Sequence, residues 1–147
     1  PGHVRRRLGV REVPIKMSAE PPREPDWRQL ASLARAEVLA AIQSLPPPLR
    51  DQAERLPVTC EHVPGEDLVG DGIEPDTLGL FVGPAYADEE ATPSPIPPQI
   101  ILFLDNVWDI AEGDLEIYRE EIRTTFLHEL GHYLGLDEDD LYDRGLD

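Results

Sequence analysis

The segment "LEIYREEIRTTFLHELGHYLG", residues 115–135, carries the strongest structural pattern in the chain. Hydrophobic side chains recur in it at the three- and four-residue spacing of a single helix face. The residues on this face are Leu115, Tyr118, Ile122, Phe126, Leu130 and Tyr133. Asp114 is suited to cap the first turn, and Gly135 is suited to end the helix in a left-handed turn. The sequence therefore predicts one long helix over residues 115–135, with a broad face packed in the core.

Two histidines and a glutamate lie near the end of this helix. His128 and His132 are four residues apart, which places them one turn apart on the same side, at the edge of the core face. Neutral imidazoles are good zinc ligands, and catalytic zinc sites combine three protein ligands with a water molecule. Glu129 can take a proton from metal-activated water. The pattern His-Glu-x-x-His thus predicts one zinc ion per chain, bound by His128 and His132, with Glu129 as the catalytic general base.

A third ligand is expected in the acidic run that follows the helix, residues 137–140. The spacing His-Glu-x-x-His-x-x-Gly-x-x resembles the metzincin signature, and the position of its third ligand is Glu138 rather than histidine. The metzincin Met-turn is missing, because Met17 is the one methionine. Asp139 is the alternative third ligand. The competing interpretation is a solvated acidic start of another helix, with no ligand in it.

An interpretation of the histidines without a metal remains open beside the metal site. Two histidines on a helix can be ordinary boundary residues, which would leave an interaction domain without a metal. His62 is a less favoured, remote ligand candidate.

The rest of the chain predicts an α+β fold. Asp26 can cap a helix over residues 27–45, and a short helical turn can follow over residues 49–56. Three segments have the apolar or alternating character of strands, and the third is apolar enough to be central; they are residues 58–63, 78–83 and 99–106. The segments between the strands, residues 64–76 and 84–98, are rich in turn residues or prolines and are expected to be loops.

Length and charge limit the classes of function. The chain has 147 residues and a formal net charge of −17, from 30 acidic and 13 basic residues. Such a surface repels phosphate backbones and anionic lipid, so we expect neither nucleic acid nor a membrane as a partner. Cys60 is the only cysteine, which excludes an internal disulfide and indicates a reducing compartment, the cytoplasm. We expect Cys60 to be a small buried residue of a strand.

The N-terminal residues differ in composition from the rest. Residues 1–16 contain a cluster of arginines but no apolar stretch of the kind found in a secretory signal. We expect residues 1–16 to be a disordered leader or upstream extension, with Met17 as the natural start and residues 17–147 as a single domain. A basic interaction arm is the alternative.

Over residues 30–141 the chain resembles the small bacterial zincin-like metallopeptidases, a family once catalogued as a domain of unknown function. The resemblance rests on "QSLPPPLRDQAERLPV" (43–58), "LGLFVG" (78–83), "QIILFLDN" (99–106) and, above all, "HELGHYLGLDEDDL" (128–141). It implies a compact α+β zincin-like domain, with a small mixed sheet packed on an N-terminal helix and on the long histidine helix. It also implies a zinc-dependent peptidase acting on peptide or protein substrates. The alternative function is a non-catalytic metal-binding module with a regulatory or structural role.

Overall fold

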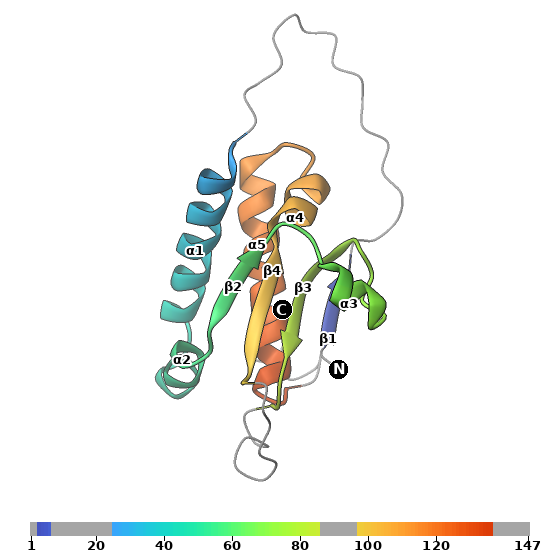
Figure 1. Cartoon of the computed structure of the whole chain (residues 1–147). Helices are drawn as coiled ribbons and strands as arrows, with labels where there is room; N and C mark the ends of the chain where they lie inside the picture. Colours follow the sequence, from blue (N-terminus) through green and yellow to red (C-terminus); the bar gives the residue numbers. More distant parts are fainter. Residues whose placement is uncertain (1–2, 7–24, 86–96, 137–147) are drawn as a thin grey trace, which may run out of the picture.

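The computed structural model describes residues 3–6, 25–85 and 97–136, which form a mixed β-sheet with helices packed on it (Figure 1). In chain order the elements are β1 (His3–Arg6), α1 (Trp27–Gln43), α2 (Pro47–Glu54), β2 (Val58–Glu61), α3 (Glu66–Gly70), β3 (Thr77–Val82), β4 (Gln99–Phe103), α4 (Leu104–Ile110) and α5 (Leu115–Tyr133). The α+β class and the mixed sheet packed on the first and last helices are confirmed.

The sheet has the strand order β1-β3-β4-β2. Strand β2 runs parallel to β4, whereas β3 is antiparallel to both β1 and β4. Strand β4 has a neighbour on each side and is buried along most of its length, as the sequence predicted for residues 99–103. Its side chains alternate between two clusters: Ile100 and Leu102 join the main core, and Ile101 and Phe103 pack on the opposite face.

The main core lies between the sheet and the helices α1 and α5, and α5 runs behind the sheet in the view of Figure 1. The predicted core face of α5 is buried from Tyr118 to Tyr133. Leu115 is the exception, because 46% of it is exposed. It lies in the first turn of the helix, where it borders a surface hollow beside Leu33 of α1 instead of packing on the sheet.

The predicted N-caps of α1 and α5 and the left-handed turn after α5 are confirmed, whereas the helices end two residues before the predicted residues 45 and 135. The Asp26 side chain accepts a hydrogen bond from the amide of Gln29, and the Gln29 side chain accepts one from the amide of Asp26. Asp114 caps α5 by accepting hydrogen bonds from the amides of Glu116 and Ile117. Gly135 has φ of +75°, the left-handed conformation that favours glycine just beyond a helix.

Two short helices, α3 and α4, occupy segments for which the sequence predicted a loop and the end of a strand. The strand expected over residues 99–106 ends at Phe103, and α4 begins at Leu104. The side-chain amide of Asn106 donates hydrogen bonds of 2.8 Å to the carbonyls of Pro75 and Thr77, which fixes the chain in a turn at this point. The short helix α3 lies inside the loop expected over residues 64–76. An apolar run alone did not distinguish a strand from a strand followed by a buried helical turn.

The expected leader contains a strand. Residues 3–6 form β1, which pairs with β3 at the edge of the sheet, and its register shifts between Arg5 and Arg6. The division into a leader of residues 1–16 and a domain of residues 17–147 stays a prediction, and Met17 lies outside the described residues.

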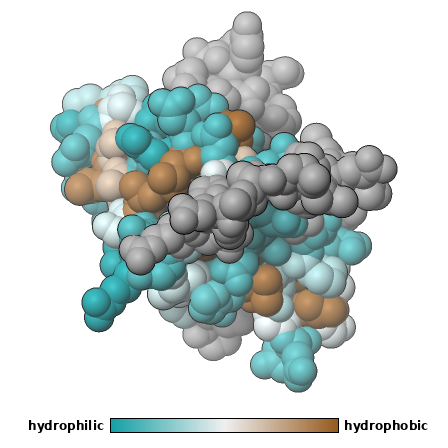
Figure 2. Space-filling model, turned by 90° about the horizontal axis from the view of Figure 1, so that it is seen from above, coloured by the Kyte–Doolittle hydropathy of each residue, from teal (hydrophilic) through white to brown (hydrophobic). Residues whose placement is uncertain are grey.

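The surface agrees with the acidic composition. Seen from above, the described surface is mainly hydrophilic, with separate hydrophobic patches (Figure 2). Among the described helices, none combines the length and hydrophobicity needed to cross a membrane.

Candidate metal centre

His128 and His132 face one another on the last turns of α5. Their Nε2 atoms are 3.1 Å apart, and their rings are nearly perpendicular, at 85°. Both side chains are half-buried, so they border the core and remain accessible. Such a short distance is favourable only when at least one of the two nitrogens carries no hydrogen. The pair therefore offers a nitrogen lone pair to a proton or to a metal ion.

The spacing fits a single ion. Two nitrogens bound to one zinc ion at about 2.0–2.1 Å in tetrahedral geometry lie roughly 3.3–3.4 Å apart. A small rotation of either ring brings the observed 3.1 Å to that value. Together with a carboxylate, two imidazoles are a donor set typical of zinc and similar transition metals.

Glu129 lies beside the two histidines and is fully buried, with 0% of it exposed. Its Oε1 accepts a hydrogen bond of 2.9 Å from the backbone amide of Phe81 in β3. Burial of a carboxylate is unfavourable unless hydrogen bonds or opposite charge compensate, and this amide supplies one such bond. Ligand atoms of His128, Glu129 and His132 all lie within 4.8 Å of one another. In the parts of the chain that the structure describes, this is the one group of three or more residues able to hold a metal ion.

The reach of Glu129 to Phe81 depends on a close approach between α5 and β3. Thr125 lies one turn before Glu129 on α5, and Gly79 lies two residues before Phe81 on β3. A Cβ atom on Gly79 would be only 2.5 Å from Cγ2 of Thr125. The glycine thus lets the helix pack against the strand closely enough for a glutamate side chain to reach the strand's amide.

Aromatic packing holds the end of α5 against the same strand. The ring of Tyr133 lies against the ring of Phe81, with centroids 5.6 Å apart, and Tyr133 is buried. Tyr133 is thus a core residue, as the helical spacing predicted.

Sequence reasoning identified the three clustered residues but missed their support from β3. The amide of Phe81 is a backbone group, which no motif records. A glycine inside an otherwise apolar strand was the available signal, because such a glycine often marks a close approach of backbone or helix.

The structure does not describe the predicted third ligands. Glu138 and Asp139, with the rest of the acidic run, lie outside the described residues, so both stay predictions. His62 is placed elsewhere: its Nδ1 contacts the carboxylate of Asp105, beyond the ends of β2 and β4. Glu129 is near Phe81, toward the end of the antiparallel strand β3. His62 and the histidine pair therefore lie at opposite ends of the sheet.

Comparison with known proteins agrees with the geometry of the site. No curated protein matches this chain. The model of the zincin-like metallopeptidase family matches residues 53–146, more than half of the chain, including the whole of α5 and the histidine pair. With a His128–Glu129–His132 cluster consistent with an HExxH metal site, the chain belongs to the zincin-like metallopeptidase family.

Proposed function

We propose that the protein is a zinc-dependent peptidase, with His128 and His132 as metal ligands and Glu129 as the general base. The observation that carries this proposal is the position of Glu129: it is buried, oriented by a backbone amide and placed beside two facing imidazoles. Family membership supports peptides or proteins as the substrate class. The cytoplasm, indicated by the single cysteine, is the compartment that we propose.

A zinc ion, when bound, supplies a Lewis acid that polarises the substrate carbonyl and makes a water molecule acidic. The chain's own residues do the rest. His128 and His132 would hold the ion through their imidazole nitrogens, on a helix whose opposite side is packed in the core. Glu129 accepts a proton from the attacking water and donates it to the leaving amine. Glu138 is the proposed third ligand, with Asp139 as its alternative.

The hydrogen bond from Phe81 sets the direction of the base. Because Oε1 of Glu129 is engaged with the amide of Phe81, the carboxylate cannot rotate freely about its last torsion. A fixed carboxylate loses less entropy when it enters the transition state, which favours catalysis. The strand β3 therefore takes part in the site through its backbone.

The same hydrogen bond also favours a second candidate function. A buried glutamate that ties α5 to β3 has a structural use, and this use is compatible with a metal-binding module that performs no hydrolysis. The two functions differ in what Glu129 does after metal is bound.

Glu129→Gln separates the two candidates. Glutamine is nearly isosteric, keeps an oxygen to accept the Phe81 hydrogen bond, and removes the base. For the peptidase we expect zinc content to persist, while hydrolysis of a peptide library falls by roughly 10²-fold or more. Zinc content is measured by elemental mass spectrometry on protein purified without a polyhistidine tag.

Glu120→Gln is the matched control, since it makes the same change on an exposed position of α5. It should retain both zinc and hydrolysis. His132→Ala should lose zinc and hydrolysis together, and its circular dichroism should show a folded protein. Wild-type protein that binds zinc and cleaves no peptide would favour the metal-binding module. Equal, substantial hydrolysis by wild type and Glu129→Gln would reject the proposed mechanism.

A further inference from the structure

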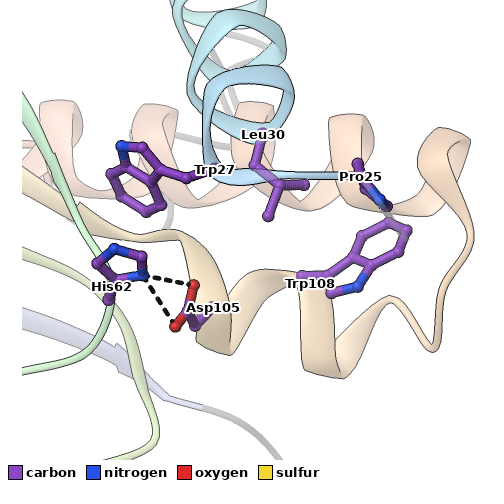
Figure 3. Close-up of a pocket in the computed structure, with 6 residues that line it drawn as sticks. All are labelled: Pro25, Trp27, Leu30, His62, Asp105 and Trp108. Atoms are coloured by element: carbon purple, nitrogen blue, oxygen red, sulfur yellow. Dashed lines mark hydrogen bonds and ion pairs between the residues drawn. The ribbon is translucent and has the colours of Figure 1, made fainter. Parts of the chain in front are cut away.

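A second concave site lies at the end of the sheet away from the histidine pair. It is a cavity of about 280 Å³ lined by Pro25, Trp27, Leu30, His62, Asp105 and Trp108. Figure 3 shows Trp27 and Trp108 on its two sides, with Leu30 between them and His62 and Asp105 along the base. We call this cavity the tryptophan pocket. His62 follows β2 and Asp105 follows β4, so the pocket lies beyond the carboxyl ends of two parallel strands, a common place for ligand sites.

One side of the pocket is a rigid stack. The rings of Trp27 and His62 are stacked at 29°, with centroids 4.0 Å apart. Nδ1 of His62 lies 3.1 Å from both carboxylate oxygens of Asp105, and the amide of Asp105 donates a hydrogen bond to the carbonyl of His62. Asp105 is therefore held by the imidazole and by its own backbone. This contact orients the carboxylate toward His62 at the surface, where 62% of the His62 side chain is exposed.

The other side is fixed by α5. Trp108 packs edge-to-face on Tyr118, with ring centroids 5.8 Å apart. The hydroxyl of Tyr118 donates a hydrogen bond of 2.8 Å to the carbonyl of Leu30, which joins α5 to α1 beside the pocket. Trp108 is thus held by a contact outside the cavity and Trp27 by its stack on His62, so the cavity need not be formed on binding.

The charge of the pocket selects the kind of ligand. Among the six lining residues, Asp105 carries the one fixed charge, and no lysine or arginine is present. The side chain of Asp105 is 47% exposed. A carboxylate can accept about four hydrogen bonds, and the contact with Nδ1 of His62 occupies only part of this capacity. Indole faces attract cations through their quadrupole; His62 covers one face of Trp27, so its other face and the ring of Trp108 are the surfaces that can reinforce the carboxylate.

A guanidinium group combines the required properties. It is planar, stacks on aromatic faces and donates hydrogen bonds to a carboxylate in a fixed fork. We propose that the tryptophan pocket binds an alkylguanidinium, the head group of an arginine side chain, between Trp27 and Trp108 with its hydrogen bonds directed to Asp105. This site is separate from the histidine pair, and the proposal does not depend on peptidase activity.

The chain contains its own reporter for the test. Its two tryptophans both line the pocket, so intrinsic tryptophan fluorescence reports on this site alone. The probe is Nα-acetylarginine amide, titrated at constant ionic strength. Nα-acetylcitrulline amide is the matched control ligand, because it replaces the guanidinium by a neutral urea of nearly the same shape. We expect a saturable change with the arginine compound and binding about tenfold weaker, or more, with citrulline.

Asp105→Asn removes the charge and keeps the size of the side chain. We expect it to weaken arginine binding by about tenfold or more. Asp51→Asn makes the same change on an exposed position of α2, away from the pocket, and should bind as the wild type does. Trp108→Leu removes one aromatic face and leaves Asp105 unchanged. It should weaken binding several-fold in a titration read from Trp27, and it provides the test if Asp105→Asn does not fold.

Three results would overturn the proposal. The first is the absence of a saturable fluorescence change with the arginine compound. The second is equal binding of arginine and citrulline. The third is unchanged binding by a folded Asp105→Asn variant, as judged by circular dichroism.

Discussion

Gly79→Ala tests whether the close contact between β3 and α5 supports the candidate site. The new Cβ would lie 2.5 Å from Cγ2 of Thr125, whereas unbonded carbons prefer about 3.5–4.0 Å. The helix or the strand must move by roughly 1 Å to relieve this contact. Because Thr125 is fully buried and β-branched, its side chain has little freedom to rotate away.

The expected loss of stability follows from two opposing effects. Overpacking of a core costs about 1–3 kcal/mol, and replacing glycine by alanine in a strand returns about 0.5–1 kcal/mol. We therefore expect Gly79→Ala to lower the free energy of unfolding by about 1–2 kcal/mol. For a chain of this length the melting temperature should fall by about 2–8 °C.

Thr125→Ser removes the obstructing methyl group and keeps the hydroxyl. By itself it should cost about 1 kcal/mol, the value of one buried methyl group. In the double variant the alanine has room, so Gly79→Ala/Thr125→Ser should be no less stable than Thr125→Ser. The coupling energy between the two changes should be roughly 1–2 kcal/mol in the stabilising direction.

Denaturant unfolding of the four proteins measures this coupling. Thr124→Ser is the control for Thr125→Ser, since it makes the same change at the neighbouring, half-buried position. Its effect should add to that of Gly79→Ala. Gly79→Ala should also lower peptide hydrolysis, because a displaced α5 moves the general base Glu129 away from the amide of Phe81. Additive effects in the Thr125 cycle would refute the reasoning about this contact.

Three further predictions concern other parts of the chain. Burial raises the pKa of the Cys60 thiol, and this effect is partly offset by Arg35, so the folded state disfavours the thiolate. The free energy of unfolding should therefore be unaffected by this group at pH 7 and should fall above about pH 8.5. Denaturant titrations of Cys60→Ala should lack that part of the decrease. Removal of residues 1–16 takes away β1 and leaves the outer edge of β3 unpaired. If a peptide substrate adds to this edge as a strand, hydrolysis should rise several-fold at unchanged zinc content. Unchanged hydrolysis would mean that the peptide binds elsewhere. Single alanine substitutions at residues 137–140, each followed by zinc titration, should show one sharp loss of affinity, at Glu138 or at its rival Asp139; four small and similar losses would contradict a ligand in this run.

The local features of this protein could be predicted from its residues alone. The helix of residues 115–133 follows from its 3.6-residue periodicity, and its ends follow from Asp114 and Gly135, because capping depends on a few adjacent residues. His128 and His132 are brought together by helical geometry alone, since residues four apart always lie on the same side. The motif therefore indicated the candidate metal site without knowledge of the sheet.

Contacts between distant segments could not be predicted in this way, because they depend on how the elements pack together. The hydrogen bond between Glu129 and Phe81 joins residues 48 positions apart, and the tryptophan pocket combines residues from α1, α4 and the end of β2. Sequence patterns report the periodicity of each element, but which faces meet depends on the strand order β1-β3-β4-β2 and on the packing of α5 against it. For the same reason Leu115, which has the spacing of a core residue, is exposed: periodicity assigns a face of the helix, and only packing determines how far along that face the core extends.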